Sequence, residues 1–129
     1  MAHLVLDQDH TLTGVHHGSI RVLRGSFVMV GTLYGTLELQ ATATALVVGW
    51  QKGGVVVAGG ALVVVTGNLD GDVFIASGGR VVVDPGGRLK GAVDNSGLLT
   101  VRGTMEGLRR GTGEVRVERG GVVRGPNPG

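Results

Sequence analysis

The chain has 129 residues, including 26 glycines, three prolines and no cysteine, and its formal net charge is +2. This length corresponds to one domain, the lack of cysteine excludes disulfides and thiolate metal sites, and the small net charge argues against a nucleic-acid-binding protein. Aromatic residues make up only 3% of the chain, so a core must be built from valine and leucine. A composition rich in valine and glycine predicts many short strands joined by tight turns.

Residues 1–12 precede the first repeat and are predicted to form an N-terminal cap or a partial first coil. They have neither the basic start nor the long apolar run of a secretory signal. The longest apolar runs further along the chain are too short to span a bilayer. These features predict a cytoplasmic protein.

Between residues 13 and 125 the frame Gly-x-x-x-Gly recurs seven times, at steps of 17, 18, 18, 20, 16 and 18 residues. The glycines are predicted to form corners, because a corner needs a positive φ or leaves no room for a Cβ atom. The predicted corners are Gly14, Gly18, Gly31, Gly35, Gly49, Gly53, Gly67, Gly71, Gly87, Gly91, Gly103, Gly107, Gly121 and Gly125. Residues 126–129 form a short C-terminal tail, in which Pro126 and Pro128 would leave a strand edge without donors.

Apolar residues alternate on both sides of each frame, which is the signal of strands with one buried face. The inward pairs predicted after the frames are Ile20/Val22, Leu37/Leu39, Val55/Val57 and Val73/Ile75. The inward pairs predicted before the frames are Val28/Val30, Leu46/Val48, Val63/Val65, Val81/Val83, Leu99/Val101 and Val115/Val117. A third extended piece centres on Leu33, Leu69, Leu89, Met105 and Val123.

Three extended sides joined by glycine corners predict an all-β, single-domain β-solenoid of triangular section. It would have about six to seven coils of ~18 residues, and neighbouring coils about 4.8 Å apart would stack to roughly 30 Å. Such a unit is too rich in helix breakers to be a helical repeat.

Two outward columns of side chains are candidate functional surfaces. One column is predicted to contain His17, Tyr34, Lys52, Asp70, Lys90, Glu106 and Arg124. From Lys52 onward its charge alternates in sign, so Lys52, Asp70, Lys90, Glu106 and Arg124 are interpreted as a charge ladder that fixes the register of the coils.

The second outward column is predicted to contain Met29, Val47, Val64, Val82, Thr100 and Arg116, with Val56 and Phe74 outward on the neighbouring strands. Exposed valine and methionine on a flat β face are unusual for a monomer. The candidate interaction face is therefore Met29, Val47, Val64, Val82, Val56 and Phe74. The alternatives are a face covered by a terminal segment and plain β-propensity.

No catalytic constellation is found in the sequence. His16 and His17 are adjacent, so in a strand they point to opposite sides and cannot share a metal. The acidic pair Asp70 and Asp72 lies outside any recurring calcium-type array. The glycine frames lack the Lys-Ser/Thr pair of a phosphate loop. We expect no catalytic residue, cofactor, metal or small-molecule substrate.

The stretches "VMVGTLYGTLEL" (Val28–Leu39) and "VVVTGNLDGDVFI" (Val63–Ile75) resemble the coil pattern of the bactofilin domain. The resemblance extends over roughly Thr13 to Arg124. It implies a right-handed β-helix that polymerises end to end without nucleotide and serves as a bacterial cytoskeletal scaffold. The short hydrophobic membrane-targeting start of that family is not evident here, and membrane association stays open.

The leading hypothesis is a non-catalytic β-helix scaffold that associates with itself. The alternative is a monomeric protein-binding module, such as an immunity protein that neutralises a partner toxin. A hexapeptide-repeat-type enzyme is the third candidate. The expected partners are the chain itself or another protein, and not nucleic acid.

Overall fold

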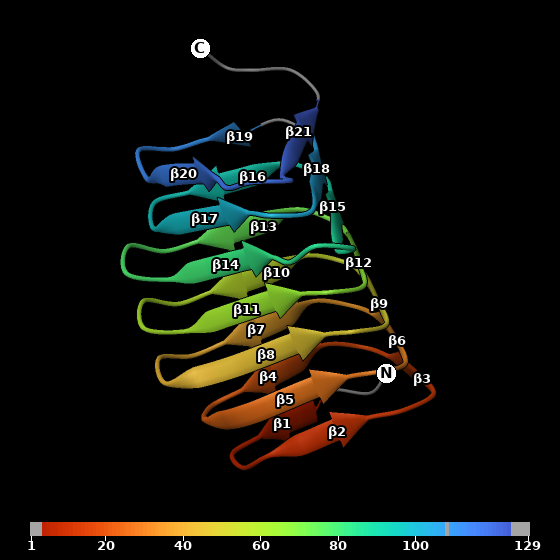
Figure 1. Ribbon diagram of the computed structural model, residues 1–129. Coiled ribbons are helices and arrows are strands. Elements are labelled where there is room, and N and C mark those ends of the chain that lie inside the picture. The colour runs from red at the N-terminus through yellow and green to blue at the C-terminus, as the bar shows by residue number, and fades with distance from the viewer. Residues whose placement is uncertain (1–3, 108, 125–129) are drawn as a thin grey trace.

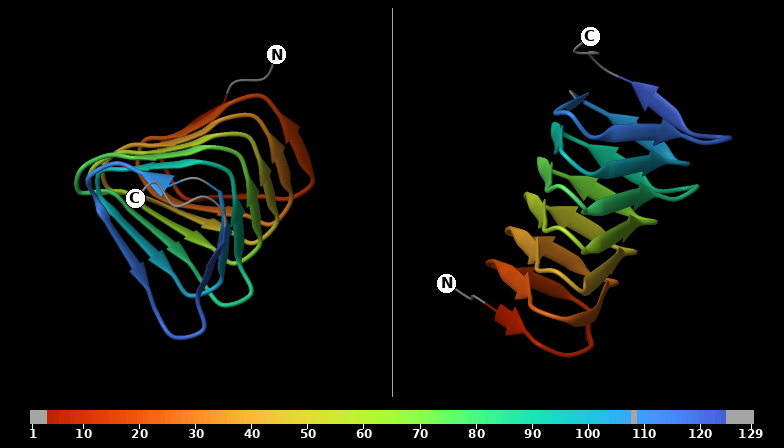
Figure 2. Two further views of the ribbon diagram at one scale, coloured as in Figure 1. Left: turned by 90° about the horizontal axis from the view of Figure 1, so that it is seen from above. Right: turned by 90° about the vertical axis from the view of Figure 1, so that its left-hand side faces the viewer.

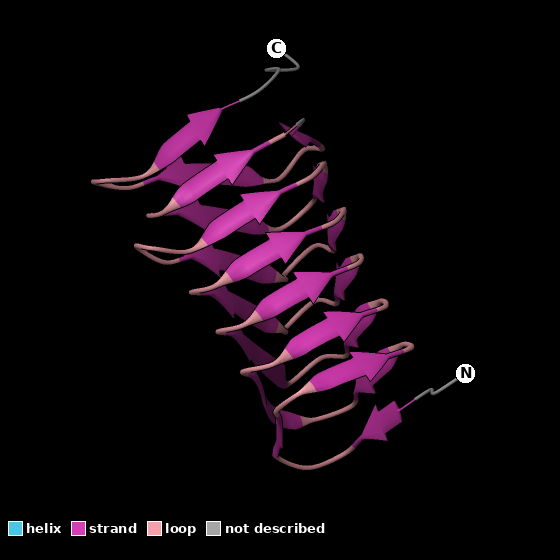
Figure 3. Cartoon of the chain, turned by 90° about the vertical axis from the view of Figure 1, so that its right-hand side faces the viewer, coloured by secondary structure: helices cyan, strands magenta, loops and turns pink. Residues whose placement is uncertain are grey.

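The computed structural model describes residues 4–107 and 109–124, and within these ranges every regular element is a β-strand (Figure 3). The strands form three parallel sheets of seven strands each, here called sheets A, B and C. Each coil of the chain contributes one strand to each sheet in turn (Figure 1). The chain is therefore an all-β solenoid of about seven coils, as the glycine period predicts.

The strands of each sheet follow one another along the axis of the solenoid. Sheet A contains β1 (Leu4–Leu6), β4 (Ile20–Val22), β7 (Leu37–Leu39), β10 (Val55–Val57), β13 (Val73–Ile75), β16 (Val93–Asn95) and β19 (Arg109–Arg110). Sheet B contains β2 (His10–Leu12), β5 (Gly25–Met29), β8 (Ala43–Val47), β11 (Leu62–Val65), β14 (Arg80–Val83), β17 (Leu98–Val101) and β20 (Glu114–Val117). Sheet C contains β3 (Val15–His17), β6 (Thr32–Tyr34), β9 (Trp50–Lys52), β12 (Asn68–Asp70), β15 (Arg88–Lys90), β18 (Thr104–Glu106) and β21 (Val122–Arg124).

Seen along the axis, the three sheets enclose a triangular interior (Figure 2). Residues 4–12 belong to this architecture, because β1 pairs with β4 and β2 pairs with β5. Since strands of neighbouring coils pair in register, side chains at equivalent positions stack into continuous columns. A column is either inward or outward over its whole length, because strand side chains alternate.

The inward columns form one core of aliphatic side chains. Every pair predicted after a frame is buried, from Ile20/Val22 to Val73/Ile75. In sheet C, Leu33, Leu69, Leu89 and Met105 are all 0% exposed, as their place between the frame glycines predicts. Valine and leucine dominate because each inward position must fill a narrow interior between the coils above and below.

Two strands of sheet B have the opposite phase from the one predicted. The sequence pattern predicts Met29 and Val47 on the outward face, but both side chains are 0% exposed. It predicts their neighbours Val30 and Val48 inside, but they are 50% and 44% exposed. Phe27 and Ala45 complete the true inward pairs, so the predicted pairs Val28/Val30 and Leu46/Val48 are wrong.

The error arises at the residue directly before the first glycine of each frame. Val30, Val48 and Thr66 occupy equivalent corner positions, because the backbone N–H of each donates to the carbonyl of the inward residue one coil below, that is Leu12, Met29 or Val47. In one coil the corner residue is the polar Thr66, so the sequence shows where the apolar alternation ends. In the other two coils it is Val30 or Val48, and the alternation then seems to continue for one more residue. This shifts the predicted inward positions of β5 and β8 by one residue.

The two glycines of a frame meet overlapping requirements. The second glycine has a positive φ, for example +155° at Gly35, which side chains rarely adopt, and a Cβ on Gly35 would also overlap the carbonyl of Gly18. The first glycine of most frames has no such φ but lacks space: a Cβ on Gly67 would overlap the carbonyl oxygens of Val48 and Gly49. Both halves of the corner prediction therefore have a structural basis, although Gly125 lies outside the described residues.

Candidate self-association surfaces

The predicted charge ladder is aligned, but its ion pairs do not form between consecutive rungs. Lys52, Asp70, Lys90 and Glu106 follow one another in the register of sheet C. Among these four described side chains no consecutive pair comes within ion-pair distance. Instead, Glu106 accepts a hydrogen bond from Arg88 at 2.9 Å, and the Asp70 carboxylate accepts one from Trp50 Nε1 at 2.8 Å. The carboxylates of Asp70 and Glu106 thus bind side chains of the second outward column of sheet C, to which Trp50 and Arg88 belong. The side chain of Arg124 lies outside the described part of the chain.

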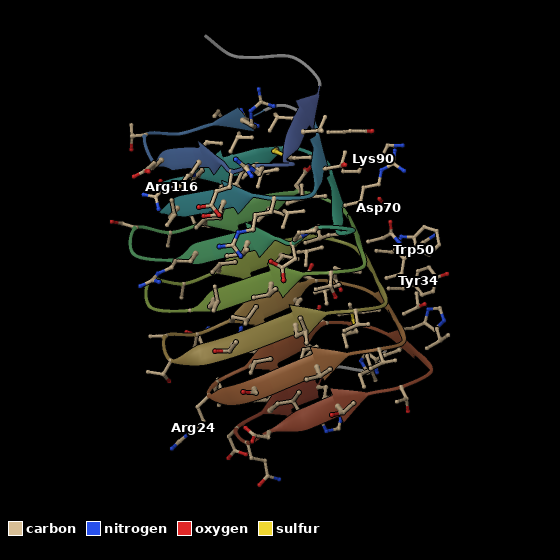
Figure 4. All side chains as sticks on the ribbon, viewed as in Figure 1. Arg24, Tyr34, Trp50, Asp70, Lys90 and Arg116 are labelled. Carbon is tan, nitrogen blue, oxygen red and sulfur yellow. The ribbon has the colours of Figure 1, made fainter. Side chains whose placement is uncertain are left out.

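The first coils of sheet C carry an aromatic cluster beside this ladder. The rings of His17 and Tyr34 stack with their centroids 4.9 Å apart. Lys52 Nζ lies 4.2 Å from the ring centroid of Trp50 and 5.8 Å from that of Tyr34. Tyr34, Trp50, Asp70 and Lys90 project from the same edge of the solenoid (Figure 4). The ring faces contact one another and a lysine across neighbouring coils, so this cluster links the coils that contribute it.

Arginine also joins coils at the corner between sheets B and C. The Arg102 guanidinium bonds the carboxylate of Glu118 in the next coil and lies 3.7 Å from Asp84 in the preceding one. The hydrogen bond to Glu118 raises the pKa of Arg102 above its ordinary value. These groups are exposed, and such pairs contribute little stability individually.

The apolar outward face exists, but with a different membership from the one predicted. In register, the outward column of sheet B contains Val28, Leu46, Val64 and Val82, and all four are half-buried by their neighbours. The predicted members Val64 and Val82 are therefore placed correctly, whereas Met29 and Val47 belong to the core. Thr100 continues the column at only 6% exposure and Arg116 ends it.

The two other predicted members of the face lie on a different sheet. Val56 and Phe74 are neighbours in the outward column of sheet A. Phe74 is 45% exposed and Val56 is half-buried. The predicted interaction face is therefore divided between two sides of the triangle and does not form one surface.

The most exposed part of the inward columns is the C-terminal end of the solenoid. Val115 and Val117 continue the columns of Leu99 and Val101. The latter two are 0% exposed, whereas Val115 and Val117 are 39% and 51% exposed. Their predicted inward position is correct, but no described coil lies above them. The sequence pattern shows which residues face inward and does not show which coil is left uncovered.

A hollow of about 360 Å³ lies at this end, lined by Val115, Val117, Val123, Asn95, Arg109, Arg110, Gly111 and Gly113. Arg109 stands in the inward column that Val93 occupies one coil earlier, and its Nη1 donates to the carbonyl of Gly107 at 3.3 Å. The hollow is the open end of the core, and its lining combines three valines with two arginines.

The buried amide of Asn95 holds the last coil in place. Its Nδ2 donates to the Glu114 carbonyl at 2.8 Å, and its Oδ1 accepts from the Gly97 N–H at 3.0 Å. Asn95 is 2% exposed, so these partners cannot be replaced readily by water. No sequence signal points to this residue beyond a polar side chain at an inward position.

We expect Asn95→Ala to destabilise the protein by about 1–3 kcal/mol, because the Glu114 carbonyl and the Gly97 N–H, both partly buried in these bonds, lose their side-chain partner. The substitution should accelerate amide hydrogen exchange in β20 by a larger factor than in β8, because Asn95 bonds β20 directly. The exposed neighbour Asp94 provides the matched control, and Asp94→Ala should change the unfolding free energy by less than about 0.5 kcal/mol. Equal effects of the two substitutions in a denaturant titration would contradict this assignment.

The N-terminal end is better covered. Leu6 is 9% exposed, and Leu4 and Leu12 are half-buried against the core. His16 stands at the end of the inward column of sheet C, and its Nε2 is buried without a hydrogen-bond partner. The outward Val15 beside it is 62% exposed. This end therefore presents aliphatic edges and two imidazoles, because His10 also lies in an inward column, stacked on Phe27.

In the parts of the chain that the structure describes, no group of three His, Cys, Asp or Glu side chains is arranged to hold a metal ion. His16 and His17 point to opposite sides of β3, as their adjacency predicts. The predicted roles of Pro126 and Pro128 fall outside the described residues. Within the described residues no helix has the length and apolar character needed to cross a membrane.

Comparison with models of known protein families, with curated proteins and with solved structures gave no match to this chain.

Proposed function

We propose that the chain is a non-catalytic β-solenoid scaffold that associates with copies of itself through the ends of the solenoid. The observation that carries the proposal is the exposure of the core at the C-terminal end. Val115 and Val117 are 39% and 51% exposed in columns whose members one coil earlier are fully buried. Fully burying an exposed valine contributes about 1.5–3 kcal/mol, so covering these two half-buried side chains with a second copy would add part of that amount for each.

The backbone at the ends favours the same association. Within the described residues, β19, β20 and β21 each have a partner strand on only one side. Unpaired strand edges bind further strands readily. The resemblance of the coil pattern to bactofilins supports the same mode, since that family polymerises end to end.

The competing hypothesis of a monomeric binding module has weaker support. It requires a broad apolar face, but Val28, Leu46, Val64 and Val82 are only half-exposed and the remaining predicted members lie in the core or on another sheet. A face of this kind is explained by the β-propensity of valine.

The proposal is tested by the assembly state of the full chain. Light scattering and electron microscopy over a range of concentrations should show assemblies that grow with concentration. Val117→Glu should shift the protein to monomers, because it places a charge in the apolar contact. Val48→Glu is the matched control, since Val48 is 44% exposed at a corner in the middle of the solenoid, and it should assemble as the parent does.

Circular dichroism of both variants should show the β-spectrum of the parent, which separates loss of assembly from loss of folding. A parent chain that stays monomeric at high concentration would overturn the proposal. So would a Val117→Glu variant that assembles normally.

A further inference from the structure

We infer that the copies associate head to tail, with the C-terminal coil of one copy stacked on the N-terminal coil of the next. The inference rests on the proposed self-association and specifies its polarity and register. Three observations carry it: the order of strands at the two ends, the side chains that end each column, and the opposite charges of the two end coils.

The first observation is that the described strands make whole coils. Each sheet has seven described strands, the first described strand is β1 in sheet A, and the last is β21 in sheet C. The next strand in this succession would again belong to sheet A, which is the position of β1 in a second copy. A head-to-tail junction therefore continues all three parallel sheets at once. A two-fold junction between like ends would require antiparallel pairing and would pair at least two sheets with unlike ones.

The second observation is that two columns are apolar at both ends, where the described residues leave them at least partly exposed. Following the register from coil to coil, Leu12 and Val117 are the first and last residues of one inward column of sheet B. Val15 and Val122 are the first and last residues of an outward column of sheet C, and they are 62% and 41% exposed. In a continued solenoid each pair comes into contact at the spacing of neighbouring strands, about 4.8 Å.

The third observation is charge. Residues 4–19 contain Asp7 and Asp9 and no lysine or arginine, whereas residues 109–124 contain five arginines and two glutamates. Asp7, Asp9, Arg110 and Arg116 are all exposed. A junction of two equal ends brings together coils whose net charges have the same sign, whereas a head-to-tail junction brings together coils of opposite net charge. The complementarity is one of net charge, because in register Asp9 begins the column that Glu114 ends, and Glu114 is already paired with Arg116. The charge pattern therefore selects the same polarity as the strand order.

The junction can be tested with single cysteines, because the chain has none of its own. Val15→Cys and Val122→Cys each introduce one uncharged, exposed thiol, and the Cα separation expected across the junction is within the range for a disulfide. We expect each variant alone to remain uncross-linked on mild oxidation, and an equimolar mixture to form disulfide-linked dimers on a non-reducing gel. A mixture of Val48→Cys and Val122→Cys is the control and should form none.

The outcomes separate this inference from the proposed function. Light scattering on the reduced samples reports whether the chains assemble at all. Assembly together with dimers from either variant alone would show a junction of like ends and overturn the head-to-tail inference only. Assembly without cross-links in any sample would overturn the register. No assembly would overturn the proposed function and this inference with it.

Charge reversal provides a second test that needs no oxidation. Arg110→Glu and Asp7→Lys should each raise the concentration of half-association by about fivefold, and the double variant should return toward the parent value. All differences should shrink at high salt, because exposed charges are screened. In junctions of like ends, Arg110 and Asp7 would lie in different junctions, so the double variant would not return toward the parent value. Equal association of all four proteins at low salt, or a double variant that does not recover, would contradict the head-to-tail arrangement.

Discussion

Val47→Asp is expected to unfold the protein, whereas Val48→Asp, one residue further along, is expected to leave it folded. Val47 is 0% exposed and stacks between Met29 and Val65 in an inward column of sheet B. A carboxylate there has no partner and no water, which costs more than about 4 kcal/mol. Val48 is 44% exposed at a corner, so a carboxylate there remains hydrated and changes stability by less than about 0.5 kcal/mol.

Thermal and urea unfolding followed by circular dichroism measure this contrast. Val47→Ala serves as an intermediate variant that removes volume without adding charge, and it should remain folded with a loss of about 2 kcal/mol. Both positions hold valine and receive the same substitution. The difference in stability therefore reports only which of the two side chains faces the core at the end of β8. If Val48→Asp were the more damaging substitution, the phase first suggested by the sequence would be right and the phase in the structure wrong.

Gly67→Ala is expected to destabilise the solenoid by about 3 kcal/mol or more. A Cβ at Gly67 would overlap two carbonyl oxygens of the coil below, and one of them, that of Gly49, accepts a hydrogen bond from the Asn68 N–H at 2.9 Å. The coils cannot separate locally without losing such bonds, so the overlap must be relieved by distorting the corner.

Gly86→Ala is the matched control. Gly86 has a φ of +87°, but a Cβ there would have no heavy atom within 4 Å. The substitution therefore costs only the strain of a left-handed residue, about 1 kcal/mol. Denaturant titrations of both variants separate the steric requirement from the conformational one. Equal losses would mean that backbone conformation alone explains the glycine corners.

Much of the fold could be predicted from the sequence because one physical requirement recurs in every coil. The glycine period follows from the absence of space at corners, and the buried pairs such as Leu37/Leu39 follow from strict alternation. The phase of β5 and β8 could not be predicted in the same way. Valine serves equally well inside a strand and at an exposed corner, so Val30 and Val48 carry no signal that separates the two environments.

The candidate surface was harder to predict than the fold. The exposure of Val117 depends on what lies above it along the axis, whereas its identity matches that of the buried Val101. Likewise, the pairing of Glu106 with Arg88 and not with Lys90 depends on side-chain reach, because both cations lie on the adjacent strand. Sequence patterns define columns, and three-dimensional packing decides how members of different columns pair.

The parallel register also determines how the protein can come apart. Every strand pairs only with the strands one coil away, so no described contact closes the solenoid between its two ends. Its stability is then a sum of couplings between nearest neighbours, as in a one-dimensional chain of cooperative units. Opening must begin where a unit has a single neighbour and advance coil by coil. A copy stacked on the last coil would remove one such starting point, so association would slow unfolding kinetically as well as add contacts.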